Sequence, residues 1–76
     1  MTIFGGLNMK IWLETLDVTV NGQDINYAVG QSNVSEISLD EDKGLVEVLY
    51  SDNNRKHKWI YLQNVEQVGY VEINYV

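Results

Sequence analysis

Hydrophobic and polar residues alternate along most of this chain, which predicts short β-strands. In the segment 10–20, four apolar side chains fall on one parity: Trp12, Leu16, Val18 and Val20. A period of two is typical of a strand with one buried face. We therefore expect a strand over 10–20, with the ring of Trp12 among the core aromatics.

Asn21-Gly22 predicts a tight hairpin turn after this strand, because both residue types tolerate the positive φ that a type I′ turn requires. A two-residue turn places Val18 opposite Ile25. It also places Leu16 opposite Tyr27, so that the apolar side chains share one face. A four-residue loop would preserve the same parity.

A second hairpin is predicted from the alternating segments 34–39 and 45–50, which flank the polar turn 40–44. The turn ends in Gly44, where a hairpin loop often needs left-handed backbone geometry. The residues expected on the inner face are Ile37, Leu39, Val46, Val48 and Tyr50. Those expected to point outward are Glu36, Ser38 and Glu47.

The segment 57–62 is aromatic and β-branched, which indicates a strand with apolar side chains on both faces. Trp59 and Tyr61 share one parity, and Ile60 and Leu62 share the other. One pair must therefore face outward or contact a partner. The exposed pair is our candidate for that contact.

Leu62, Val65 and Val68 are spaced by three, which predicts a single 3₁₀ or α turn that ends at Gly69. Alternation resumes over 70–76. The fold class expected is all-β, a small antiparallel barrel or sandwich of about five to six short strands with one late helical turn. The late strand, single turn and final strand are similar to the general plan of SH3-like and Sm-like barrels, a likeness of architecture that implies no function.

The length of 76 residues predicts one domain over 1–76, with 1–9 as a loose tail because Met9-Lys10 resembles a second start. The chain has no cysteine, so no disulfide supports the core. No apolar run approaches the roughly 18 residues that a membrane span needs. The opening residues lack the pattern of a secretion signal, so a cytoplasmic location is the default expectation.

The charge is negative and unevenly distributed. The net charge is −6, and between Ile11 and Asp52 nine acids accompany one base, Lys43. Such a surface repels nucleic acid and anionic membranes over most of its area and attracts basic proteins.

Catalytic and metal-binding patterns are absent from the sequence. His57 is the only histidine and lies among bases, and no serine has the context of a hydrolase nucleophile. Asp40-Glu41-Asp42 lacks the spacing of a calcium loop, so a solvated turn is the better interpretation. We expect no enzymatic activity, no metal and no cofactor.

The first functional hypothesis is a small acidic inhibitor or adaptor that occupies a basic surface of a nucleic-acid-processing protein such as a nuclease, polymerase or CRISPR effector. Carboxylates on a rigid sheet can imitate phosphates, as in phage-encoded anti-defence proteins that act as DNA mimics. The expected contact residues are Glu14, Asp24, Glu36, Asp40, Glu41, Asp42, Glu47, Trp59 and Tyr61.

Two alternatives remain open. A small barrel could bind RNA or single-stranded DNA through the segment 55–61, with Arg55, Lys56 and Lys58 on phosphates and the aromatic rings under bases. A charged hairpin loop explains the same bases more simply. The chain could also be a structural subunit that forms a homodimer by pairing the edge strand 70–76.

Overall fold

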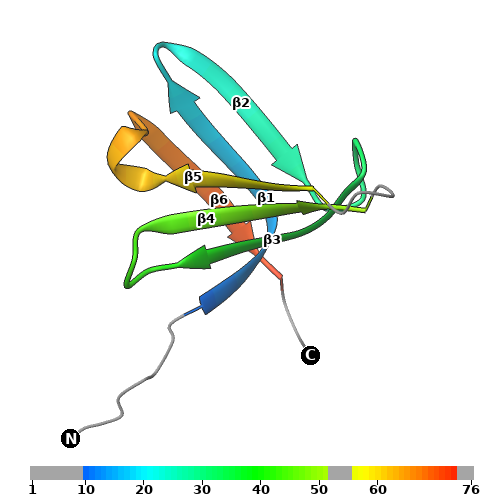
Figure 1. The fold of residues 1–76 in the computed structure, drawn as a ribbon. Coiled ribbons are helices and arrows are strands. Elements are labelled where there is room, and N and C mark those ends of the chain that lie inside the picture. Colours follow the sequence, from blue (N-terminus) through cyan, green and yellow to red (C-terminus); the bar gives the residue numbers. More distant parts are fainter. Residues whose placement is uncertain (1–9, 52–55, 74–76) are drawn as a thin grey trace, which may run out of the picture.

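The computed structural model describes residues 10–51 and 56–73. These form six strands and one 3₁₀ turn (Figure 1): β1 Lys10–Val20, β2 Gln23–Ala28, β3 Val34–Asp40, β4 Leu45–Tyr50, β5 His57–Tyr61, η1 Leu62–Asn64 and β6 Gln67–Glu72. The predicted all-β class is confirmed. The predicted tail 1–9, the turn residues 52–54 and the end of the last strand, 74–76, lie outside the described residues.

The strands make one antiparallel sheet that curls into a half-barrel (Figure 1). Strand β1 organises it, because its first half pairs with β3 and its second half pairs with both β2 and β6. Beyond β3 the sheet continues through β4 to β5. One long strand, β1, thus joins β3, β4 and β5 on one side of the sheet to β2 and β6 on the other.

The first hairpin forms in the predicted register, with Val18 opposite Ile25 and Leu16 opposite Tyr27. Asn21 and Gly22 adopt φ values of 53° and 78°, as a turn of this hand requires. The second hairpin also agrees with the sequence, since Gly44 has φ 61° at the end of the β3–β4 turn.

The core lies on the concave face of the sheet. Eight side chains are buried there: Leu13, Leu16, Val18, Val34, Ile37, Leu39, Val46 and Val48. Each stabilises the fold by roughly 1.5–3 kcal/mol through the apolar area that it removes from water. We call the opposite side of the sheet the outer face.

The expectation that Trp12 belongs to the core is wrong, because its side chain is 38% exposed on the outer face. The register of β1 against β6 shifts between Leu13 and Thr15, which marks a bulge around Glu14. A bulge adds one residue to a strand, so the parity that points inward changes there. Leu13 and Leu16 are consequently both buried although three positions separate them.

The predicted late turn is confirmed as η1, but Gly69 does not end it. Gly69 lies inside β6, which starts two residues earlier at Gln67. Pairing explains the difference, because β1 offers Thr19 as the partner of Gln67 and Asp17 as the partner of Gly69. Among the described residues, no helix is long and apolar enough to cross a membrane.

Candidate functional site

A row of four side chains crosses the outer face. Trp12 on β1 pairs with Ser38 on β3, Ser38 pairs with Glu47 on β4, and Glu47 pairs with Trp59 on β5. Directly opposed residues of antiparallel strands project to the same side of a sheet. The pairing therefore places one carboxylate and one hydroxyl between two tryptophans, a set that we call the outer row.

The segment 57–62 exposes its aromatic pair. Trp59 and Tyr61 are 56% and 51% exposed, whereas Ile60 and Leu62 pack against the core. Tyr61 continues the aromatic surface next to the outer row, because it pairs with Leu45 and Leu45 pairs with Asp40. The alternative left open by the sequence is thereby decided in favour of Trp59 and Tyr61.

Charged or aromatic groups lie against both tryptophans. The ring of His57 stacks on that of Trp59 with centroids 5.5 Å apart and planes 14° apart. His57 Nδ1 also contacts Glu47 Oε2. At the other end of the outer row, Lys10 Nζ lies 5.4 Å from the centroid of Trp12, within cation–π range.

A shallow hollow of about 180 Å³ lies in the outer row between Trp12 and Glu47. Ser38 lines it and is only 5% exposed, although its residue type and parity predict an outward-pointing polar side chain. A small side chain between larger ones leaves this space. Leu49, His57, Glu36 and Lys10 complete the lining.

The predicted acidic residues all lie away from the core. Glu36, Asp40 and Glu47 alternate with the buried residues of β3 and β4, and Asp24 pairs with Thr19. Glu14 is at the bulge, and Glu41 and Asp42 are in the β3–β4 turn. The structure thus brings Glu36 and Glu47 together at the hollow and leaves the others spread over the outer face and one turn.

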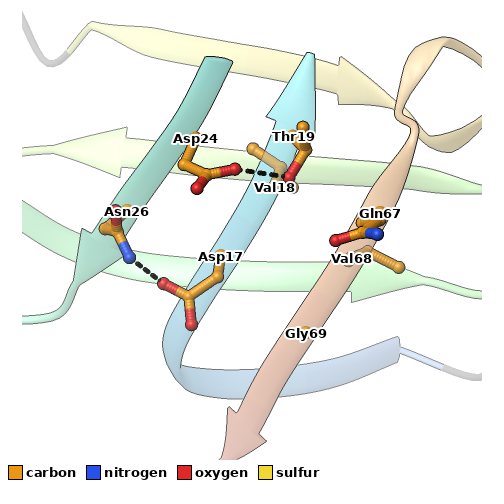
Figure 2. A pocket seen from close by; sticks show the side chains of 8 residues that line it. All are labelled: Asp17, Val18, Thr19, Asp24, Asn26, Gln67, Val68 and Gly69. Atoms are coloured by element: carbon orange, nitrogen blue, oxygen red, sulfur yellow. Dashed lines mark hydrogen bonds between the residues drawn. The ribbon is translucent and has the colours of Figure 1, made fainter. Parts of the chain in front are cut away.

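A second hollow, of about 390 Å³, includes an acid that was not among the expected contacts (Figure 2). Asn26 Nδ2 donates a hydrogen bond to Asp17 Oδ1, and Thr19 Oγ1 donates one of 2.7 Å to Asp24 Oδ1. Gly69 on β6 leaves room beside Asp17. The sequence indicated only that Asp17 points away from the core, because it alternates with the apolar residues of 10–20. Its place in this hollow depends on the pairing of β1 with β6, which the sequence analysis did not predict.

Within the segment 55–61, Lys58 has the parity opposite to the exposed rings of Trp59 and Tyr61, although all three residues line one groove. Arg55 lies outside the described residues. Lys58 pairs with the buried Val48 and so has the parity of the inner face, opposite to Trp59. It borders an apolar groove of about 230 Å³ where β5 faces the hairpin of β1 and β2, next to Tyr27 and Ile60.

No group of three or more histidine, aspartate or glutamate side chains in the described part of the chain is placed to hold a metal ion. Comparison with protein-family models, curated proteins and solved structures finds no match to this chain.

Proposed function

We propose that this chain is a small binding protein, an inhibitor or adaptor that uses the outer face of its sheet to occupy a basic surface of a nucleic-acid-processing protein. One observation carries the proposal. Trp12, Trp59 and Tyr61 are exposed on the same face as the carboxylates of β3 and β4.

Exposed rings on a rigid sheet are suited to anchor a partner. Tryptophan and tyrosine dominate interface hot spots because they bury large areas with little loss of side-chain entropy. The stacking of His57 on Trp59 limits the freedom of that ring before binding. Less ordering therefore remains to oppose association.

The carboxylates supply the attraction and the preference for basic partners. With a net charge of −6, the chain attracts cationic surfaces over a distance set by the ionic strength. Proteins that handle nucleic acids present such surfaces.

Binding to a purified candidate partner tests the proposal. The chain is first used to capture proteins from a lysate, and the protein retained at low salt is purified and titrated. We expect the nucleic acid that this partner binds to compete with the chain, and moderate salt to weaken the complex. We also expect Trp59→Ala to weaken binding, while Gln63→Ala, an exposed change in η1 and outside the sheet, leaves it unaltered. A partner with no affinity for nucleic acid would contradict the proposal.

The nucleic-acid-binding alternative has less geometric support. Glu47 lies directly opposite Trp59, where it would repel the phosphate of a base stacked on that ring. A titration of the chain with fluorescent RNA and single-stranded DNA distinguishes the two. Tight binding that is lost on neutralising Arg55, Lys56 and Lys58 would replace the proposed function.

Self-association is a second candidate, favoured by one observation on β6. Among the strands that the structure describes, β6 pairs only with β1, and all six of its residues are exposed, including Val68, Tyr70 and Val71. A free, apolar strand edge can pair with a second copy. Light scattering over a range of concentrations tests this, and a strict monomer would remove the candidate.

A further inference from the structure

We propose that the hollow in the outer row binds one arginine side chain of the partner. This inference rests on the proposed function, because it names the group that the basic partner inserts. It depends on three features of the hollow: a buried hydroxyl, two carboxylates and an aromatic ring that already carries a cation.

The hydroxyl of Ser38 is the first feature. Ser38 lines the hollow and is only 5% exposed, and its hydroxyl makes no hydrogen bond with any group in the described part of the chain. A buried hydroxyl without a partner is unfavourable, so native structures supply one from protein, water or ligand. The hollow that Ser38 lines offers space for that partner, and a guanidinium N–H can donate to the serine oxygen.

The second feature is the charge at the rim. Glu36 and Glu47 both line the hollow from neighbouring strands. Glu47 is held by His57, while Glu36 is exposed. The other ionisable groups of the lining are the ammonium of Lys10 and the imidazole of His57, which contacts Glu47. Glu36 therefore offers a carboxylate to a cationic guest.

The third feature is the ring of Trp12. Lys10 Nζ lies 5.4 Å from its centroid, so a cation already occupies a position over this ring. Lys10 is exposed and at the start of β1, so solvent can take its place at little cost. An arriving guanidinium would compete with Lys10 for the tryptophan.

Arginine fits this set better than lysine does. Its guanidinium is planar, stacks on aromatic rings, is weakly hydrated, and directs five N–H donors in a fixed fork toward carboxylates. The volume of about 180 Å³ accommodates a planar head group together with water, since one water molecule takes roughly 30 Å³ in the liquid.

The test uses the full chain and capped tripeptides as probes: Gly-Arg-Gly, Gly-Lys-Gly and the neutral Gly-citrulline-Gly. Amide and indole N–H resonances are followed by NMR, with the Trp12 signal assigned from Trp12→Phe. A ligand this small binds weakly, with a Kd on the order of 1–10 mM. We expect the arginine peptide to shift the signals of Trp12 and Ser38 and to saturate, the lysine peptide to bind several-fold more weakly, and the citrulline peptide to cause no change.

Matched variants separate the hollow from net charge. Ser38→Leu fills the space, and Glu36→Gln leaves the contact of Glu47 with His57 intact; each should weaken arginine binding by roughly tenfold. Asp42→Asn makes the same charge change in the β3–β4 turn and should have little effect. A retained amide spectrum confirms that Ser38→Leu is folded.

Lys10→Ala should strengthen arginine binding, because it removes the competing cation from Trp12. Lys43→Ala makes the same charge change away from the hollow and serves as its control. Equal strengthening by both variants, or equal weakening by Glu36→Gln and Asp42→Asn, would overturn the proposal in favour of unspecific charge attraction.

The outcomes also separate this inference from the proposed function. If arginine peptides leave Trp12 unshifted while the chain still binds a basic nucleic-acid-processing protein, the arginine site is wrong and the proposed function stands. If the peptides bind as expected but no such protein is retained, the site stands and the proposed function fails.

Discussion

The backbone N–H of Gly22 donates a 3.0 Å hydrogen bond to Glu66 Oε1, which joins the first hairpin turn to a residue 44 positions later in the chain. The adjacent backbone strengthens this link, since Glu66 N–H donates to Thr19 O over 2.8 Å. One carboxylate thereby fastens the tip of the β1–β2 hairpin to the start of β6.

Glu66→Ala should therefore destabilise the fold by about 0.5–1.5 kcal/mol, the usual net contribution of one intramolecular hydrogen bond. Glu66→Gln keeps an acceptor oxygen and should lose less. Urea unfolding followed by tryptophan fluorescence measures both. Glu41→Ala, an exposed acid of the β3–β4 turn, is the control. An equal loss in the control would show that general charge, and not this hydrogen bond, is responsible.

Replacing Gly22 or Gly69 by alanine should change the stability of the fold by different amounts, although both glycines have open space around them. No atom lies within 4 Å of a Cβ built at either Gly22 or Gly69, but Gly22 has φ +78° and Gly69 is in extended strand geometry. Gly22→Ala should cost about 1–2 kcal/mol from the left-handed backbone alone. Gly69→Ala should be neutral or stabilise by up to about 1 kcal/mol, because alanine restricts the unfolded chain. Thermal unfolding of the two variants makes the comparison, and similar losses would contradict the turn geometry.

Leu16 is central to the core, since it is fully buried and its strand partners are Tyr27 and Tyr70. Leu16→Ala should destabilise the chain by about 2–5 kcal/mol through lost burial and a residual cavity. That is a large part of the total for a domain of this size, for which roughly 4–11 kcal/mol is typical. Far-ultraviolet circular dichroism and urea titration would detect the partly unfolded variant. Val71→Ala, at a position 54% exposed, should change stability by less than about 0.5 kcal/mol.

Trp59 and Ile60 are adjacent and face opposite sides of β5, which allows binding and stability to be separated. Trp59→Ala should reduce stability by less than about 1 kcal/mol, because Trp59 is 56% exposed and its stacking on His57 is an exposed contact. Ile60→Ala should cost about 2 kcal/mol or more, since Ile60 packs on the core. In the partner titration we expect the reverse ranking, with Trp59→Ala the weaker binder. If Ile60→Ala weakens partner binding more than Trp59→Ala does, the outer face is not the contact surface.

Local patterns sufficed to predict the hairpins. Alternation defined the strands, and Asn21-Gly22 and Gly44 marked turns whose backbone geometry few other residue types adopt. The same reasoning gave the wrong face for Trp12. A bulge between Leu13 and Thr15 changes which alternate positions point inward, and no sequence pattern marks that bulge. This reasoning failed at Gly69 for a related reason, since a strand can contain glycine where a neighbouring strand supplies its hydrogen bonds.

The candidate site was only half visible in the sequence. Trp59 and Tyr61 were identified as one of two pairs, and Glu36 and Glu47 as acids of outward parity. The hollow at Ser38 requires the register of β1 on β3 and of β3 on β4, which relates residues 12, 38 and 47. Cross-strand neighbours depend on pairing between distant segments, and that pairing leaves no local signal.

By itself, the amino-acid sequence determined the β-class, the positions of the two hairpins and the anionic character of the chain, because these depend on alternation, turn residues and charge within a few positions of one another. Only the tertiary structure decided which aromatic rings are exposed, where β1 bends, and which carboxylates meet beside a buried serine. Those features depend on which strand lies beside which, and that choice is made by burial of the whole core rather than by any segment of the chain.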